Sequence, residues 1–481
     1  MADVLPILLA FPPEKSVTTP KSYDKAIHEY LKSLETIDET TYTQKVEKQN
    51  LLELLDPAVN SIAYLRTLVA QLEASSNDDH EHLDVLETRT LLFFATFDPV
   101  QIRYAGTDFL KLWRWLLGSV TQNDDIDLTS VVNALLRLDP TAGTLITPHL
   151  EVVRLCLARS VPSQALPILD KDVYALPARS QKGVPEELPS DEHELSNAWI
   201  TEKSGFSLRM DTPQVLEYYL VGASIYMGLG IWHRARIFLE AVILSPSLSH
   251  TASALQVEAY KKWLMVGLIV QGKPYPEPKT HDPVVLKHLK TLSRMYDEFA
   301  LDFELRNLKK LQADVETGWR DVQEDGNAGL VREMVDACMR YRIIDLQKTY
   351  AALPVTRMAK LLDIAPGDAL QSLQRMMQEG HLPASLSGAG TDTVLRFHDT
   401  TSSESHSDLE AQTLRIQALV TQVRDADRRL QLTKEYVEHA RRNAARGGFD
   451  SDPADAMDLT WDASSTMPNA ADLDNDEDLM M

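Results

Sequence analysis

Two histidines separated by one residue, His80 and His82, are the side chains that most suggest metal chemistry. Such a pair supplies two zinc ligands in the hydrolase pattern H-x-H-x7-S-x2-D, in which the final carboxylate is the third. Catalytic zinc needs three protein ligands and an open position for water. At this spacing Thr90 replaces the serine and Phe93 replaces the carboxylate. Because phenylalanine cannot bind a metal, we interpret the pair as solvated histidines; a hydrolase would need a third ligand supplied by the fold.

Other patterns that could carry chemistry are also incomplete. Gly267-x4-Gly272-Lys273 is spaced like a phosphate-binding loop, but Pro274 stands where a Ser or Thr would hold Mg²⁺. The residues before it continue an apolar helix rather than a strand. No G-x-S-x-G motif is present, and neither Cys156 nor Cys338 has the local context of a nucleophile. We therefore predict no catalytic, cofactor-binding or metal-binding residues, and no enzymatic activity.

Composition points to a large protein of a reducing compartment. The 481 residues, 44% of them hydrophobic, exceed what one compact domain needs, and two cysteines cannot form a disulfide framework. The net charge of −23 argues against a nucleic-acid partner, whose phosphates attract basic proteins. The N-terminus is a poor signal peptide, and no apolar run is long enough for a membrane span. We expect a soluble intracellular protein that does not bind a membrane.

Helical periodicity dominates the chain from residue 23 to residue 330. Dipeptides such as Asp98-Pro99 and Asp139-Pro140 separate the periodic segments, which is typical of helix ends. Short loops between antiparallel helices predict a mainly α fold with a tetratricopeptide-like solenoid. An acidic, proline-containing loop is expected at 177–212, and an extended or disordered N-terminus at 1–22. We predict helices at 23–37, 59–72, 82–97, 99–120, 128–138, 148–158, 255–270, 283–303, 305–311 and 329–341.

One helical pair fits the tetratricopeptide pattern W-x2-L-G-x2-Y in its first helix. The matching segment is Tyr218-x2-Val221-Gly222-x2-Ile225, and Phe238, Ala241 and Pro246 follow at that repeat's spacing. Arg234 departs from the pattern, which has a small residue there. The pattern predicts two helices that pack closely at Gly222, with Phe238 inserted between them.

The pattern changes at residue 331, where the predicted elements become shorter. Three helices and a two-stranded wing predict a winged helix over 331–400. Its third helix carries one arginine, Arg375, against Asp368 and Glu379, so it is not a typical DNA-reading helix. The elements expected are helices at 343–353, 355–364 and 367–378, and strands at 382–386 and 393–398.

A heptad pattern runs along a single long helix predicted at 408–446. A seven-residue apolar period is typical of a coiled coil or helical bundle. At roughly 1.5 Å per residue the helix would be about 58 Å long, so much of its apolar stripe needs partners from outside its own domain; the alternative is a helix that folds back on its own chain. We call this stripe the C-terminal seam: Leu409, Ile416, Leu419, Val423, Ala426, Leu430 and Val437. After it, residues 447–481 hold ten acidic and no basic residues, which predicts a disordered acidic tail.

A solenoid that leads into a winged helix and a long terminal helix resembles the PCI family, whose module is shared by the proteasome lid, the signalosome and initiation factor 3. Short motifs in a shared order resemble the third-subunit family of the signalosome more specifically. These motifs are Ile102-Arg103-Tyr104-Ala105, Leu166-Pro167-Ile168-Leu169-Asp170 with Asp172, Glu258-Ala259-Tyr260-Lys261-Lys262, Leu268-Ile269 to Gly272-Lys273, Asn327-x-Gly329-Leu330-Val331 and Arg396-Phe397-His398-Asp399.

The resemblance implies a non-catalytic scaffold in the cytoplasm and nucleus. The signalosome removes a ubiquitin-like modifier from cullins and so regulates cullin-RING ubiquitin ligases, and its metalloprotease is a different subunit. Partners would be other signalosome subunits, bound through a bundle of terminal helices and through edges of the winged helices. The expected edge strand is Val394, Leu395, Arg396, Phe397 and His398. The alternatives are a PCI scaffold of the proteasome lid and a stand-alone tetratricopeptide-type adaptor for peptides.

Overall fold

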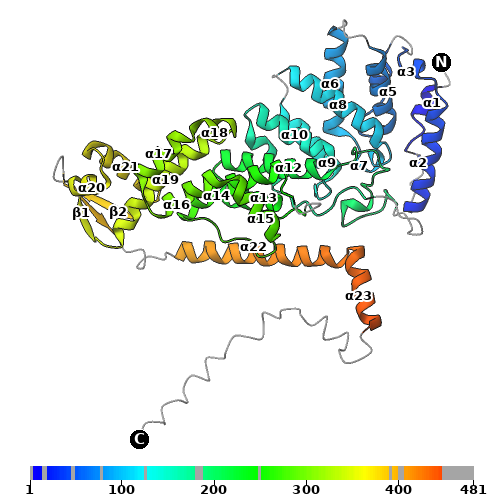
Figure 1. The fold of residues 1–481 in the computed structure, drawn as a ribbon. Coiled ribbons are helices and arrows are strands. Elements are labelled where there is room, and N and C mark those ends of the chain that lie inside the picture. Colours follow the sequence, from blue (N-terminus) through cyan, green and yellow to red (C-terminus); the bar gives the residue numbers. More distant parts are fainter. Residues whose placement is uncertain are drawn as a thin grey trace. The chain divides into compact units, whose positions relative to one another are not determined.

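The computed structural model describes residues 4–12, 19–44, 49–75, 80–123, 127–178, 188–246, 251–388, 393–398 and 406–446. Helices make up most of these residues (Figure 1), which confirms the predicted mainly α fold class. The chain divides into two compact units, Met1–Ser402 and Ser403–Met481. Each unit is described by itself. The predicted acidic tail, 447–481, lies outside the described residues.

The first part of the larger unit is a series of helices whose apolar faces share one core. Helix α9 is typical: Asp127 caps its first turn by accepting a hydrogen bond from the Thr129 N–H, and its apolar residues recur every three or four positions. The helices are α1 (Val4–Leu8), α2 (Pro20–Glu35), α3 (Glu39–Tyr42), α4 (Leu51–Leu54), α5 (Ser61–Ala74), α6 (His80–Thr96), α7 (Pro99–Ile102), α8 (Gly106–Gln122), α9 (Leu128–Leu138), α10 (Thr147–Ala158) and α11 (Leu166–Leu169), with a short 3-10 helix at Pro162–Ala165.

The prediction of an extended or disordered N-terminus is wrong for the residues that the structure describes there. Helix α1 buries Leu8, and Phe11 is buried against the rings of Tyr23 and Tyr30, whose centroids lie 5.4 and 5.3 Å away. The Tyr30 hydroxyl donates to the Leu8 carbonyl oxygen, and the Asn60 side-chain amide donates to that of Phe11. The burial of Leu8 and Phe11 therefore stabilises a folded N-terminal segment even though that segment contains prolines.

The second part of the solenoid begins after the described portion of the acidic loop, where Ile200 and Phe206 are buried. Two of the single helices predicted from sequence are divided in the structure: 99–120 becomes α7 and α8, and 283–303 becomes α15 and α16. The second division occurs at Ser293, whose backbone leaves the helical region. The helices are α12 (Thr212–Gly228), α13 (Trp232–Ile243), α14 (Ala254–Gln271), α15 (Pro283–Leu292), α16 (Arg294–Glu304), α17 (Leu308–Thr317) and α18 (Trp319–Glu324), with a 3-10 turn at Ser196–Ala198.

Helices α12 and α13 form the hairpin that the tetratricopeptide-like spacing predicts. Phe238 is buried between them. A Cβ atom added at Gly222 would lie only 2.7 Å from Cε1 of Phe238 and 3.0 Å from Cδ2 of Leu169. The glycine is therefore needed for close helix packing, which confirms that part of the prediction.

Helix α19 (Ala328–Gln347) joins the solenoid to the winged helix without a linker. Its first half contributes Val331, Met334 and Cys338 to the solenoid core, and Ile343 belongs to a second core. The predicted domain boundary at 330/331 therefore falls inside one helix. The helix predicted at 343–353 is wrong beyond Gln347, because residues 352–354 form a strand.

The winged helix has three strands rather than the two predicted. Its elements are β1 (Ala352–Pro354), α20 (Val355–Leu362), α21 (Pro366–Gln378), β2 (Ala384–Ser387) and β3 (Val394–Phe397). The strand order is β1-β3-β2, and both pairings are antiparallel. The predicted edge strand, Val394–His398, is therefore the central strand, and this prediction is wrong. The reason is that Leu353 precedes a proline, which disfavours helix and frees the segment to pair with β3.

The smaller unit contains α22 (His406–Gln431) and α23 (Lys434–Arg446). Sequence predicted one helix over 408–446, but the helix is interrupted at Leu432 and Thr433. The Thr433 hydroxyl donates to the Leu430 carbonyl oxygen and accepts from the Tyr436 N–H, so it caps the start of α23. The C-terminal seam is thus divided, with Val437 on α23 and its other residues on α22.

One buried histidine makes the solenoid core sensitive to pH. His149 lies in the first turn of α10 with 1% of its surface exposed, and its Nδ1 accepts from the Ile146 N–H at 3.5 Å. Burial lowers the pKa of His149 to about 4, although the Asp139 carboxylate acts in the opposite direction. The imidazole is therefore neutral in the folded protein near neutral pH.

We expect Gly222→Ala to reduce the free energy of unfolding by about 1–3 kcal/mol, because its methyl group would overlap Phe238. Gly228→Ala is the matched control in the same helix, since a Cβ there has nothing within 4 Å; it should be neutral or stabilising by roughly 0.5–1 kcal/mol. Urea unfolding followed by circular dichroism measures both. Equal effects of the two substitutions would contradict close packing at Gly222.

The buried His149 predicts a loss of stability in mild acid. An unfolded histidine binds a proton near pH 6.5, whereas the folded one does so only near pH 4, so stability is present above pH 6.5 and falls between these values. The loss should reach roughly 3 kcal/mol at most. We expect His149→Gln to flatten this part of the urea-midpoint profile, whereas replacing the exposed His233 by Gln should leave it unchanged. An unaltered slope in the His149 variant would rule out this residue as the cause.

Candidate interaction surfaces

The positions that would complete a zinc site at His80 and His82 belong to the core. Thr90 is buried, and its hydroxyl donates to the Leu86 carbonyl oxygen. Phe93 is buried among aromatic rings, with the ring of Tyr64 stacked at 6.0 Å. The side chains of His80 and His82 themselves lie outside the described residues. Among the residues that are described, no cluster of three or more His, Cys, Asp or Glu side chains could hold a metal ion.

The glycine pattern that resembles a phosphate loop is the end of a helix. Gly267 lies inside α14, where an added Cβ would be 2.9 Å from the Tyr275 backbone nitrogen. Gly272 ends the helix with φ of 72°, a left-handed conformation that favours glycine. The spacing of these glycines therefore comes from close packing and helix termination.

The open edge of the winged-helix sheet is β2. The Phe397 N–H donates to the Ala351 carbonyl oxygen, and the His398 N–H donates to the Pro383 carbonyl oxygen. Along an antiparallel strand, every second residue directs its N–H and C=O groups toward the same neighbouring strand. Since Pro383 bonds to β3, the N–H and C=O groups of Ala384 and Leu386 point away from β3. The other edge, β1, includes Pro354, which has no N–H to offer.

The C-terminal seam is exposed along both helices that carry it. The exposed fractions are 45% for Leu409, 61% for Ile416, 49% for Leu419, 67% for Val423, 52% for Leu430 and 53% for Val437. Ala426 is also exposed. Their periodicity distinguishes them from scattered surface leucines, because the residues on α22 recur at heptad spacing along one side of that helix.

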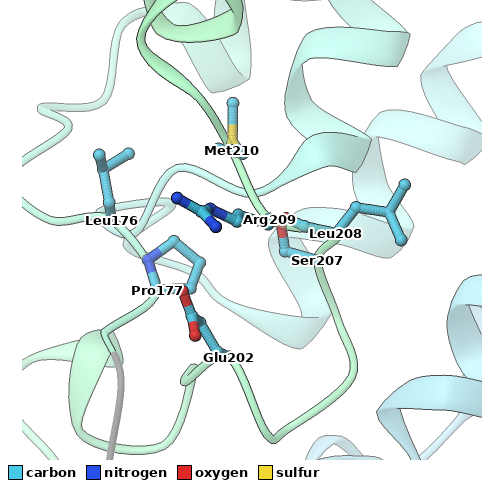
Figure 2. Close-up of a pocket in the computed structure, with 7 residues that line it drawn as sticks. All are labelled: Leu176, Pro177, Glu202, Ser207, Leu208, Arg209 and Met210. Atoms are coloured by element: carbon cyan, nitrogen blue, oxygen red, sulfur yellow. The ribbon is translucent and has the colours of Figure 1, made fainter.

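A small pocket of about 390 Å³ lies beside the loop that precedes α12 (Figure 2). Leu176 and Leu208 form its apolar sides, and the charged groups of Glu202 and Arg209 lie between them. Arg209 also pairs with Asp211 at 3.5 Å, and both side chains are largely exposed. A catalytic pocket would usually hold desolvated polar groups, and these are solvated.

Comparison with known proteins assigns the chain to a family. Residues 22–285 match the family model described as "COP9 signalosome complex subunit 3, N-terminal helical repeats". The COP9 signalosome complex subunit 3 of Emericella nidulans is 32% identical over 428 residues, which cover 84% of each chain. The chain belongs to the COP9 signalosome subunit 3 family. The protein of the same name from Neurospora crassa is 24% identical over 496 residues, which cover 99% of this chain and 98% of that one.

Motifs that resemble the subunit 3 family meet in space at the joints between helices. Lys261 of α14 donates two 2.8 Å hydrogen bonds to the Asp325 carboxylate, and Lys262 donates to Asn327 at 3.0 Å. Tyr296 of α16 donates to Asp325 and accepts from the Asn327 amide. This network connects α14 and α16 to the turn that starts α19. The motif that contains Lys261 and Lys262 and the motif that begins at Asn327 therefore hold the same helices together.

The end of α14 forms a second joint. The Tyr341 hydroxyl donates to the Val270 carbonyl oxygen at 2.6 Å, and its ring packs on Gly272. Arg306 donates to the Gly272 carbonyl oxygen and pairs with Asp345 at 2.9 Å. Cationic and hydroxyl donors thus satisfy the carbonyl groups at a helix C-terminus and fix α19 on the solenoid.

Other family motifs behave in the same way. The Arg103 guanidinium stacks over the Trp199 ring at 4.7 Å and donates to the Pro189 carbonyl oxygen. Asp170 accepts from the Tyr226 hydroxyl at 2.8 Å. These residues hold the loop and α12 in place, and sequence inspection alone gave no indication of their partners.

In the part of this chain that the structure describes, no helix is both long enough and apolar enough to cross a membrane.

Proposed function

We propose that this chain is a scaffold subunit of a signalosome that holds neighbouring subunits and does not itself catalyse a reaction. Membership of the subunit 3 family carries the proposal. It also favours the signalosome over the proteasome lid and over a stand-alone adaptor. In this proposal the assembled complex removes a ubiquitin-like modifier from cullins and so regulates cullin-RING ligases, in the cytoplasm and the nucleus.

The C-terminal seam supports a scaffold role because it is too apolar to remain in water. Burying each of its larger side chains would stabilise an assembly by roughly 1.5–3 kcal/mol. The seam faces one side of α22, whereas Thr421 and Arg428 lie on the opposite side at heptad spacing. We infer that helices from other subunits cover the seam in a bundle.

The open edge of β2 supports a second contact. The outward N–H and C=O groups of Ala384 and Leu386 can extend the sheet by one strand from a neighbour. We infer that the neighbour pairs with β2 and not with the central strand β3. The proline in β1 makes the opposite edge a poorer partner.

Substitutions in the C-terminal seam test the main proposal. We expect Ile416→Asp, Val423→Asp and Leu430→Asp together to lower recovery of other signalosome subunits with the tagged chain by about tenfold or more, because three seam side chains would be charged. The matched control places Asp at Leu414, Thr421 and Arg428, on the opposite face. Mass spectrometry of the purified assemblies measures recovery, and circular dichroism checks folding. Unchanged recovery in the seam variant would refute the bundle.

A separate experiment tests the sheet edge. We expect Ala384→Pro to remove an outward N–H group while leaving the β2–β3 hydrogen bonds intact, and so to weaken incorporation several-fold. Ala352→Pro makes the same change on the β1 edge and should have little effect. Native mass measurement of the purified complex compares them. Equal loss of incorporation in both variants would indicate general damage to the sheet. Loss of incorporation only in the Ala352 variant would show that the neighbour pairs with β1 and would contradict the proposal.

A further inference from the structure

A groove of about 720 Å³ lies between α17 and α19, and none of its lining residues belongs to β2, α22 or α23. Seven residues line it: Gln312, Val315, Glu316, Trp319, Arg332, Val335 and Asp336. All belong to the larger unit.

The two walls of the groove have the same construction. On α17, Gln312, Val315 and Glu316 occupy positions i, i+3 and i+4, which place them on one helical face. On α19, Arg332, Val335 and Asp336 repeat this spacing. Each wall therefore presents one valine followed by one carboxylate, and the two valines form an apolar floor.

Trp319, the first residue of α18, enlarges the apolar part of this groove. Val315 is buried, whereas Val335 and Trp319 are half-buried. The Arg332 guanidinium lies over the Trp319 ring at 5.0 Å. The arginine thus forms a cation–π contact with the ring, and the half-exposed surfaces of Val335 and Trp319 are the apolar part of the groove that another side chain can contact.

The rims of the groove are acidic. Glu316 and Asp336 are exposed on opposite walls, and no ion pair found among the described residues includes either one. Among the nearby cations, Lys310 pairs with Asp302 and Arg320 pairs with Glu324, whereas Arg332 lines the groove itself and Arg375 interacts with Asp336 through its charge. Burial raises the pKa of Glu333; Arg340 and Arg375 act to lower it, and the Asp336 carboxylate adds to the rise.

We propose that this groove binds an amphipathic helix of another protein, whose apolar stripe is flanked by Lys or Arg. The apolar floor between two helices matches the helix-in-groove mode of recognition. Glu316 and Asp336, for which no ion pair is found among the described residues, would each meet a basic residue on either side of that stripe, while the Arg332 guanidinium stays over the Trp319 ring. An acidic partner or a nucleic acid would instead be repelled.

Site-specific photo-crosslinking tests the proposal in the full-length chain, expressed in its own cells. A benzophenone amino acid replaces Gln312 at the rim, and the control places it at Ala313, an exposed neighbour that does not line the groove. After irradiation, mass spectrometry identifies the cross-linked peptide. We expect one segment with apolar residues at i, i+3 and i+4 and flanking Lys or Arg, absent from the Ala313 control.

A charge swap decides whether the rims recognise that segment. We expect Glu316→Lys with Asp336→Lys to lower the cross-link yield by about tenfold, and Lys→Glu or Arg→Glu on the partner to restore it. Glu35→Lys with Glu304→Lys changes the net charge equally at exposed positions that do not line the groove and should leave the yield unchanged. A cross-linked segment without basic flanks, a cross-link to nucleic acid, or an unaltered yield would overturn the proposal. Seam variants cross-linked in parallel should keep the groove contact, so failure of the scaffold proposal would be seen separately.

Discussion

Helix α19 is the element on which the larger unit depends, because its two halves belong to different cores. Val331, Met334 and Cys338 pack with the solenoid, and Ile343 packs with the winged helix. A flexible linker between the two parts would let each move by itself. A single 20-residue helix instead transmits the orientation of one core directly to the other.

Such a shared helix is useful only if its position on the solenoid is fixed. The network of Lys261, Lys262, Tyr296, Asp325 and Asn327 fixes its start, and Tyr341 with Arg306 fixes its middle against the end of α14. Hydrogen bonds to charged groups contribute about 1.5–3 kcal/mol each, and a buried group that loses its partner costs more. Directional bonds of this kind select one helix orientation, which apolar packing alone does less strictly.

Sequence predicted the helical class, the Gly222 contact and the exposed apolar stripe, because each depends on a local period or spacing. It failed where long-range contacts decide the outcome. Phe11 orders the N-terminus through Tyr23 and Tyr30, which lie beyond a proline-containing stretch. Strand β1 has three residues and gains its conformation from β3, some 40 residues later, so no periodicity could have identified it. Because the sequence-based prediction did not include β1, it placed β3 at the edge of a two-stranded sheet, whereas β3 is the central strand of three.

The same contrast explains why Thr90, Phe93 and Gly267, which fall at positions of catalytic motifs, serve the packing of helices. Thr90 and Phe93 are enclosed by core side chains, and a Cβ added at Gly267 would lie 2.9 Å from the Tyr275 backbone nitrogen, so these residue types are explained by packing. Several charged residues in the family-like motifs instead form hydrogen bonds where helices meet. Lys262, for example, donates hydrogen bonds to Glu258 and Asn327. Among the described residues, the surface features argued above are the outward backbone groups of β2, the exposed apolar residues of α22 and α23, and the groove between α17 and α19. Strand addition at a sheet edge and helix packing on an apolar surface are both known modes of protein–protein recognition, and here the features that suit them belong to different elements of the chain.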